Sequence, residues 1–148
     1  MNDISRSARS SNAARVLARK LALQALYRWQ LNPCQWQDLM SDFELSDESP
    51  RADREFFQAL VHEISERCAE LDTQLTGWLD RRADELDPIE HAVLLIGLQE
   101  LRAHPEVPFR VVINEAVALA RKFGATDGHK FVNAVMDKAA RELRPHER

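Results

Sequence analysis

Apolar residues recur along the chain with the three- and four-residue spacing of α-helices. From Asn12 to about Leu31 they form one broad apolar face. That face consists of Ala14, Leu17, Ala18, Leu21, Ala22, Ala25, Leu26 and Trp29. The other side of the same helix carries Val16, Lys20, Leu23 and Tyr27, with Arg15 and Arg19 at its edge. A helix that is apolar on two sides is either central to the fold or meets a second partner.

Two prolines and an acidic segment divide the next part of the chain. Asn32 followed by Pro33 predicts a cap with proline at the first helical position, and a second helix of about ten residues. The stretch from Glu44 to Pro50 is acidic, contains serine and is expected to be a loop. Pro50 is expected to open a long third helix, which Gly77 interrupts. Its predicted buried residues are Phe56, Leu60, Ile64, Leu71 and Leu75.

The clearest helix start lies at Asp87-Pro88-Ile89-Glu90, where Asp87 is a cap and Glu90 is placed for a reciprocal capping box. The helix that follows is apolar almost all round and ends near His104, so it is predicted to be a core helix. Another helix is expected from about residue 108 to 123, with Gly124 as a left-handed C-cap. Thr126 or Asp127 then caps a last helix that runs to about residue 143.

No segment shows the sustained alternation of a strand. The pattern therefore predicts an all-α fold of about six or seven helices without a sheet. Residues 80–87 are the expected seam between an N-terminal bundle (about 12–80) and a C-terminal bundle (about 87–145) of one helical domain. Residues 1–11 are polar and basic and are expected to form a flexible tail.

Charge is distributed unevenly along the 148 residues, although the net charge is only −4. Residues 1–30 hold six Arg or Lys against one Asp, and residues 121–148 hold seven against four acids. Residues 35–90 hold sixteen acids against five Arg. A polyanionic partner would respond to the local potential of the basic ends and not to the net charge. Solvation of helix faces is the ordinary alternative for any one cluster.

Several classes of protein are not supported by the sequence. No apolar run reaches the length of about 18 residues that a membrane helix needs, and the N-terminus lacks the apolar stretch of a secretory signal. Cys34 and Cys68 are far apart, which indicates free thiols in a reducing cytoplasm. Glycine-rich phosphate loops, nucleophile elbows and metal-ligand spacings are absent, so no enzyme activity, metal or cofactor is expected.

Nucleic-acid binding is better supported. The tail and first helix concentrate six basic residues, namely Arg6, Arg9, Arg15, Arg19, Lys20 and Arg28. Tyr27 lies on the same side as Lys20 and is placed to stack on an unpaired base. Near the other end, Lys130-Phe131 follows a predicted helix start, where free N–H groups favour an anion. The alternative is that Phe131 is a core residue and Lys130 is simply solvated.

Two sequence motifs resemble those of a known family. The first is residues 23–31, LQALYRWQL. The second begins at residue 112 with VINEA, continues with LA at 119 and KFGA at 122, and ends with DGHKFVN at 127–133 and DK at 137. Both motifs, in this order, are similar to those of NusB, the family of bacterial transcription antitermination factors. The resemblance extends over about residues 12–145.

The resemblance implies an all-helical fold of two small bundles and binding of the boxA RNA element together with the ribosomal protein NusE. It further implies assembly, through that pair, of an antitermination complex on RNA polymerase. The matching RNA-contact positions are Arg15, Arg19, Tyr27, Lys130 and Phe131. Asp127 matches an acid that tunes RNA affinity downward, and Glu90 matches an acid near the shared RNA and NusE surface.

The chain departs from the family at the start of the first helix. Family members often carry consecutive arginines there, whereas Val16 and Leu17 separate Arg15 from Arg19 in this chain. Arg6, Arg9 and Lys20 are the candidates to supply the missing charge, which is a hypothesis.

Two other functions stay open at this point. One is the RNA-binding module of an RNA methyltransferase, whose cofactor domain and catalytic cysteine are not found in these 148 residues. The other is a helical adaptor that binds only protein. A homodimer is also open, because an apolar surface that serves NusE could equally support self-association.

Overall fold

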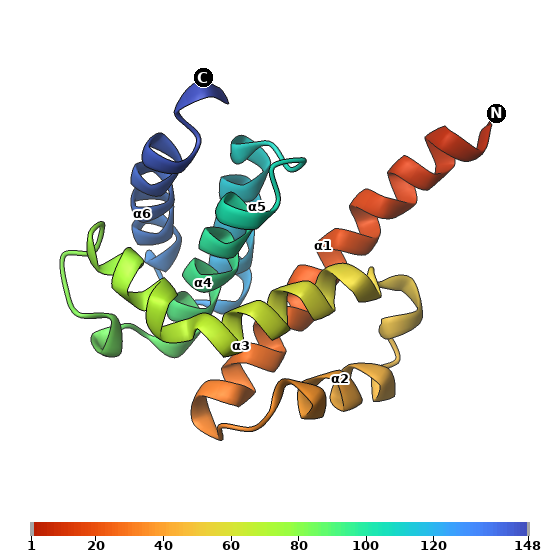
Figure 1. Cartoon of the computed structure of the whole chain (residues 1–148), viewed down its shortest axis with the longest axis horizontal. Coiled ribbons are helices and arrows are strands. Elements are labelled where there is room, and N and C mark those ends of the chain that lie inside the picture. Colours follow the sequence, from red (N-terminus) through yellow and green to blue (C-terminus); the bar gives the residue numbers. More distant parts are fainter. Residues whose placement is uncertain (1, 148) are drawn as a thin grey trace. The chain divides into compact units, whose positions relative to one another are not determined.

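The computed structural model describes the backbone of residues 2–147 and the side chains of residues 12–147. Over this range it contains helices and no strand, which confirms the predicted all-α fold (Figure 1). The α-helices are α1 (Asn2–Leu31), α2 (Trp36–Leu45), α3 (Arg54–Thr76), α4 (Pro88–Ala103), α5 (Phe109–Phe123) and α6 (Gly128–Leu143). Short 3₁₀ helices are η1 (Ser49–Arg51), η2 (Ala83–Glu85) and η3 (Pro145–Glu147). Residues 2–11, predicted as part of a flexible tail, continue α1, and the side chains of Arg6 and Arg9 lie outside those that are described.

The chain divides into two compact units, Met1–Ser65 and Glu66–Arg148. The division lies inside α3, next to Arg67, whose φ of −117° and ψ of 20° are not helical. This is earlier than the seam predicted at residues 80–87. Residues after Gly77 do not form a free linker, because Trp78 and Leu86 are buried in the second unit.

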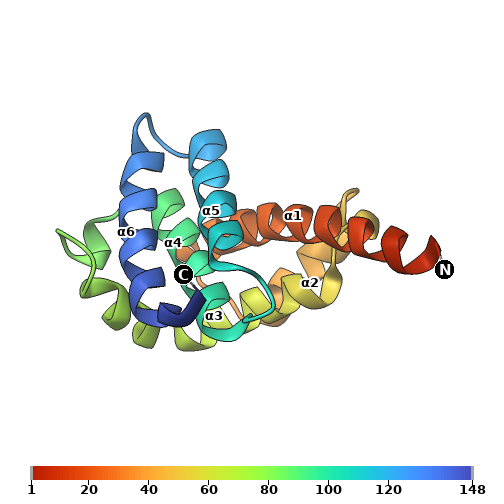
Figure 2. The same cartoon turned by 90° about the horizontal axis from the view of Figure 1, so that it is seen from above.

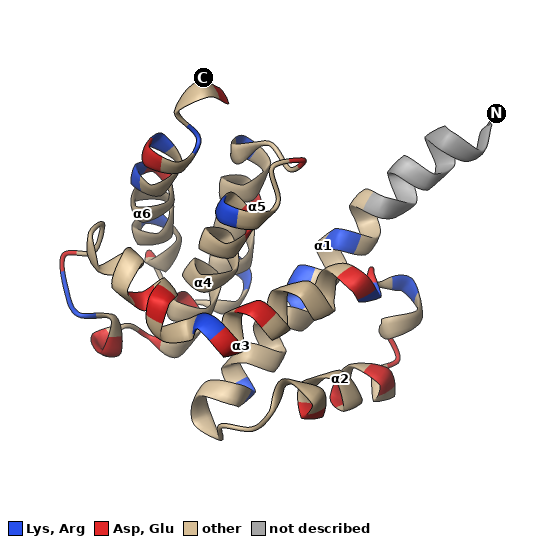
Figure 3. Ribbon diagram, in the orientation of Figure 1, with Lys and Arg blue, Asp and Glu red and all other residues tan. Residues whose placement is uncertain are grey.

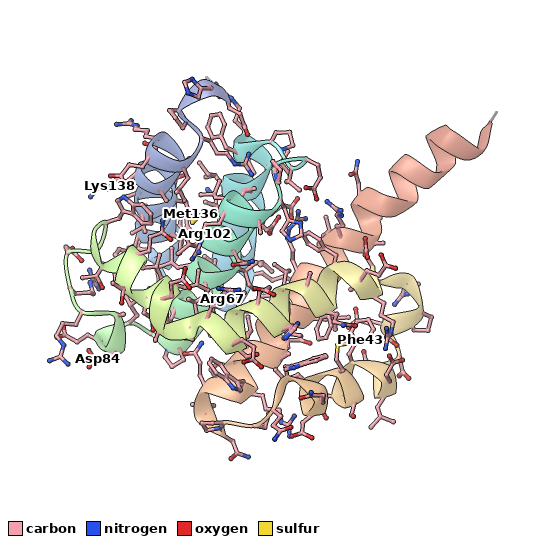
Figure 4. All side chains as sticks on the ribbon, viewed as in Figure 1. Phe43, Arg67, Asp84, Arg102, Met136 and Lys138 are labelled. Carbon is pink, nitrogen blue, oxygen red and sulfur yellow. The ribbon has the colours of Figure 1, made fainter. Side chains whose placement is uncertain are left out.

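The first unit is organised around the packing of α1, α2 and the first half of α3. Phe43 projects inward from α2 (Figure 4) and its ring stacks on that of Phe57, with centroids 4.3 Å apart. Leu26 and Leu39 are fully buried in the same unit. Burial of such side chains stabilises the fold by roughly 1.5–3 kcal/mol each.

Two predicted helix starts in this unit are wrong. The second helix begins at Trp36 and not at Pro33, because Gln35 is still extended and the Trp36 ring stacks on His62 at 4.4 Å. Pro50 lies in η1 and does not open α3. The cap of α3 is Asp53, whose Oδ1 accepts the backbone N–H of Phe56 at 3.0 Å.

The second unit is built on a bundle of α4, α5 and α6, which lie side by side (Figures 1 and 2). Helix α4 is its centre, since every residue from Ala92 to Leu101 is buried, as the apolar pattern predicted. Gly97 permits a close approach of Met136: a Cβ atom on Gly97 would lie 2.5 Å from Cε of that side chain. A larger residue at this position would have to displace a fully buried neighbour.

Both ends of α4 are closed by side chains. Oδ2 of Asp87 accepts the backbone N–H of Glu90 at 3.3 Å, which confirms the predicted cap. At the other end, the buried guanidinium of Arg144 donates to the carbonyl oxygens of Glu100, Leu101 and His104. The carbonyl oxygens of Glu100 and His104 also accept backbone N–H groups, from His104 and Val107. The Leu101 carbonyl has no such donor, because proline at position 105 lacks an N–H, and the guanidinium supplies it.

The turn between α5 and α6 differs from the prediction. Gly124 is extended, with φ of −89° and ψ of −178°, and is not a left-handed cap. The left-handed residue is Asp127, whose φ is 68° and which immediately precedes α6. Aspartate tolerates this conformation better than most residues, because its short polar side chain makes local contacts.

Candidate nucleic-acid interface

The basic residues of α1 are partly neutralised within the first unit. Nζ of Lys20 donates to both carboxylate oxygens of Glu48, at 3.1 and 2.9 Å. Nε of Arg15 lies 3.6 Å from Oδ2 of Asp53. The acids come from the segment between α2 and α3, in a region where acidic residues are frequent (Figure 3). The local positive potential of α1 is therefore lower than its sequence indicates.

Arg19 is not a surface residue. Its exposed fraction is 3%, and its guanidinium carbon lies 5.1 Å from the centre of the Phe56 ring. The guanidinium of Arg15 lies over the same ring at 4.5 Å. Two arginines thus share one aromatic ring, and Arg19 is the more deeply placed of the two. A phosphate could reach Arg15 with less rearrangement than Arg19.

Tyr27 is the exposed aromatic residue of α1. Its exposed fraction is 38%, and Val16, further back on the helix, is 46% exposed. Arg28 is beside it in sequence but is held by an ion pair with Asp42 of α2. Exposure of the phenol ring is compatible with base stacking, which stays a prediction.

In the second unit the candidate residues gather at the turn from α5 into α6. Lys130 is largely exposed, and its Nζ lies 3.3 Å from Oδ1 of Asp127, which is exposed as well. Phe131 is half-buried. Its ring is covered by the guanidinium of Arg81, whose central carbon lies 4.5 Å from the ring centre. Phe131 therefore is neither a fully buried core residue nor an open stacking surface.

Glu90 supports this turn from within the second unit. Its exposed fraction is 8%, and its carboxylate lies against the backbone at Gly128. The capping box is reciprocal only in prediction: Asp87 accepts the Glu90 N–H, whereas the Glu90 carboxylate is directed at the turn before α6. A Cβ atom on Gly128 would collide with the Glu90 carboxylate, so this close approach depends on glycine.

Burial also changes the acidity of Glu90. Desolvation, and secondly the negative charge of Asp87, raise the pKa of the Glu90 carboxyl above its ordinary value. The Arg81 charge and the Ala125 N–H act in the opposite direction and are the smaller effects. Glu90 is thus an internal support for the turn, which presents little carboxylate surface to a partner.

The structure brings together some of the predicted residues within each unit. Asp127, Lys130, Phe131 and Glu90 lie at one turn of the second unit, whereas Arg15, Arg19, Lys20 and Tyr27 lie along α1 in the first. The sequence interpretation missed Arg81 and its partner Asp80. The only signal for them was a pair of arginines, Arg81 and Arg82, within a strongly acidic segment.

One cluster has the residue types of a catalytic triad but not their chemistry. Nε2 of His91 lies 2.6 Å from Oδ1 of Asp72, and Sγ of Cys68 lies 3.7 Å from Oδ2 of the same carboxylate. Burial and the Asp72 carboxylate raise the pKa of the Cys68 thiol to about 12. A nucleophilic cysteine needs its pKa lowered, so this arrangement keeps the thiol protonated.

The described residues also bear on metal binding, membrane insertion and cofactor binding. Among the described residues, no group of three or more His, Cys, Asp or Glu side chains is placed to hold a metal ion. None of the described helices combines the length and apolar character needed to cross a membrane. A pocket of about 160 Å³ lies between α1 and α2, with Leu21, Leu39 and Phe43 among its lining residues. A pocket of this size is small for an organic cofactor.

Comparison with known proteins agrees with the fold. Residues 16–141 match the model of the NusB family. The chain is 45% identical to the transcription antitermination protein NusB of Hahella chejuensis over 130 residues, which cover 88% of this chain and 87% of the relative. It is 46% identical to the NusB protein of Alcanivorax borkumensis over 135 residues, covering 91% and 90%. The structure of T. maritima NusB is similar with a TM-score of 0.74 and 25% identity, covering 86% and 91% of the two chains.

Proposed function

The chain belongs to the NusB family, and we propose that it acts as a transcription antitermination factor that binds boxA RNA of ribosomal RNA transcripts together with ribosomal protein NusE. In this proposal the protein has no catalytic role. It helps to assemble the antitermination complex on RNA polymerase through RNA and NusE. The relatives that it matches over 87% and 90% of their lengths are named antitermination proteins, which favours this function over that of a methyltransferase module.

The observation that carries the proposal is the pair Lys130-Phe131 at the start of α6. Lys130 is an exposed cation, and among the described side chains its ion-pair partner is an exposed carboxylate three residues earlier. Such surface ion pairs contribute about 0–1 kcal/mol, so a phosphate oxygen can replace Asp127 at little cost. In this proposal an unpaired base stacks on the part of the half-buried Phe131 ring that Arg81 does not cover.

Asp127 has a defined part in this proposal. Its carboxylate competes with RNA for Lys130 and repels a neighbouring phosphate. The left-handed backbone of Asp127 places that carboxylate directly before the helix. Removal of the charge in Asp127→Asn should therefore strengthen RNA binding. An unchanged affinity would argue against a phosphate at Lys130.

The first unit contributes Tyr27 and the accessible part of Arg15 in this proposal. Both residues keep the roles expected from the family pattern, one as a stacking ring and the other as a phosphate contact. Lys20 contributes after release from Glu48. Arg19 acts indirectly, because its burial over Phe56 holds the helix that carries the others.

The decisive experiment is a titration of the protein with single-stranded boxA RNA and with a scrambled RNA of the same composition, with and without NusE. We expect preference for boxA and tighter binding when NusE is present. Equal binding of both RNAs under all conditions would overturn the specific function.

A second experiment assigns the surface. Lys130→Gln should weaken binding and reduce the slope of log K against log salt by about 0.7, the value for one phosphate of a single strand. Phe131→Leu should weaken binding with little change of slope, because stacking is largely uncharged. Arg141→Gln is the matched control, since Arg141 is exposed on the same helix and paired with Asp137, but lies about 16 Å further along it.

A further inference from the structure

Arg81 combines a cation, an aromatic contact and exposure, and the ring that it contacts is Phe131 of the proposed RNA surface. Its side chain is 45% exposed, and its guanidinium lies over the Phe131 ring at 4.5 Å. Nε donates to Oδ1 of Asp80 at 2.7 Å and Nη2 to Oδ2 at 3.3 Å. In the part of the chain that the structure describes, the Nη1 hydrogens of Arg81 donate to no acceptor, so donor capacity remains.

Phe131 has an ion pair over its ring and a second, similar pair that involves the residue before it in sequence. Lys130 is paired with Asp127, and Arg81 is paired with Asp80. In each pair the cation is held by a carboxylate close in sequence, and both partners are exposed. Exposed pairs of this kind are weak and are screened by salt, which makes both cations available to a stronger anion.

An arginine is better suited than a lysine to this position. Its planar guanidinium can stay stacked on an aromatic ring while its edge donates two parallel hydrogen bonds to a phosphate. The hydrogen bonds that Arg81 donates to Asp80, and secondly the charges of Asp80, Glu90 and Glu85, raise the pKa of Arg81. Arg81 is thus a permanent cation at a ring that is proposed to stack on a base.

We propose that Arg81 is a further RNA-contact residue, which exchanges Asp80 for an RNA phosphate while its guanidinium stays stacked on Phe131. This inference rests on the proposed RNA binding. It extends the binding surface from the α5–α6 turn to the segment that precedes α4 within the second unit. Asp80 then has the same effect as Asp127, since each carboxylate competes with RNA for its own cation.

Arg82 provides a matched control in the next position. It is also exposed and also paired with a nearby carboxylate, Asp84, but no aromatic contact is found for it among the described side chains. Asp84 lies on the outer part of the segment before α4 (Figure 4). A general effect of positive charge would be the same for both arginines, whereas a specific contact would involve Arg81 alone.

The test is a set of salt-dependent titrations of boxA RNA by fluorescence anisotropy with wild type, R81Q, R81K, R82Q and D80N. R81Q should weaken binding and reduce the salt slope by about 0.7. R81K should keep the slope but bind more weakly than wild type, because an ammonium does not stack as a plane. R82Q should match wild type, and D80N should bind more tightly.

The outcomes separate this inference from the proposed function. If wild type binds boxA RNA and R81Q binds it equally well, or if R81Q and R82Q have equal effects, the Arg81 contact is overturned while the proposed function stands. If wild type binds no RNA, both fail. Circular dichroism melts accompany each variant. If R81Q melts early, D80N, which retains Arg81, decides the question: unchanged or weaker binding by D80N overturns the exchange.

Discussion

Nε of Arg144 donates to the carbonyl oxygen of Leu101 at 2.9 Å, which joins the end of α6 to the end of α4. The same guanidinium donates to the carbonyl oxygens of Val107, Glu100 and His104 and is paired with Glu147. One buried cation thus connects the residues that follow α4 with the residues that follow α6.

Arg144→Met should destabilise the protein by about 3 kcal/mol, because the buried carbonyl oxygens of Leu101 and Val107 lose their donor together. Urea unfolding followed by circular dichroism measures this loss. Arg141→Met is the control, since its side chain is 65% exposed and its loss should cost less than about 1 kcal/mol. Equal costs for the two variants would show that the cap of α4 contributes little.

Gly97→Ala should reveal how tightly α4 and α6 are packed. Alanine is the better helix former by about 1 kcal/mol, but its Cβ atom would lie 2.5 Å from Cε of Met136. We expect a net destabilisation of about 1–2 kcal/mol in wild type. In a Met136→Ala background the same change should be stabilising, because the opposing side chain is gone. Thermal melts of the four proteins in this cycle give the coupling directly, and a coupling of zero would contradict the close contact.

Glu90→Gln should change how stability depends on pH. The native state raises the pKa of Glu90 above its unfolded value, so the native state binds the proton more tightly. The stabilising contribution is complete below the unfolded pKa and is lost as pH rises through the native one. The stability of the variant relative to wild type should therefore increase from about pH 4 to pH 7. Urea unfolding midpoints of both proteins across this pH range measure the sign of the change in stability. A stability difference that stays constant with pH would show that Glu90 is not titrated differently in the native state.

Cys68 should resist alkylation in the folded protein. With a pKa of about 12, the thiolate is a fraction of roughly one in ten thousand at pH 8, and the thiolate is the reactive form. Iodoacetamide labelling of a Cys34→Ser variant, read by mass spectrometry, should be slow in buffer and fast in urea. Asp72→Asn should accelerate labelling of the native state, because a carboxylate charge that raises this pKa is removed. Rapid labelling before unfolding would contradict the assigned environment.

Arg19→Leu separates a structural role from an RNA contact. Loss of the contact with Phe56 at a buried position should reduce stability by about 2 kcal/mol. Lys20→Gln, at a partly exposed ion pair, should cost less than about 1 kcal/mol. Unfolding curves and RNA salt slopes are measured on both variants. If Arg19→Leu left the stability unchanged but reduced the salt slope of RNA binding, Arg19 would be a phosphate contact and not a structural residue.

Local sequence signals were reliable where the structure depends on neighbours in the chain. Residues 92–101 are apolar on almost all sides of their helix, which predicted a core helix. Asp87 caps α4, as its position before Pro88 indicated. The same reasoning failed at Pro33 and Pro50. The first helix after Pro33 starts at Trp36, whose ring stacks on the distant His62. After Pro50 the cap is Asp53, a local signal three residues further on that the proline obscured.

The same contrast between local features and long-range contacts applies to the candidate site. Lys130 and Phe131 were identified by sequence because helix starts, basic residues and aromatic residues are local features. Arg81 was missed because its contact joins residues that are fifty positions apart. Glu90 was expected near a partner surface, whereas its side chain is buried against Gly128.

The sequence by itself therefore determined the helices, their core faces, the uneven charge and the family of this protein. Periodicity, caps and motifs are properties of residues close together along the chain, and they survive without knowledge of packing. Only the tertiary structure decided that Arg19 is buried, that Glu48 and Asp53 offset the basic charge of α1, and that Arg81 covers Phe131. The effective charge and accessibility of a side chain depend on what packs against it, and those neighbours come from distant parts of the sequence.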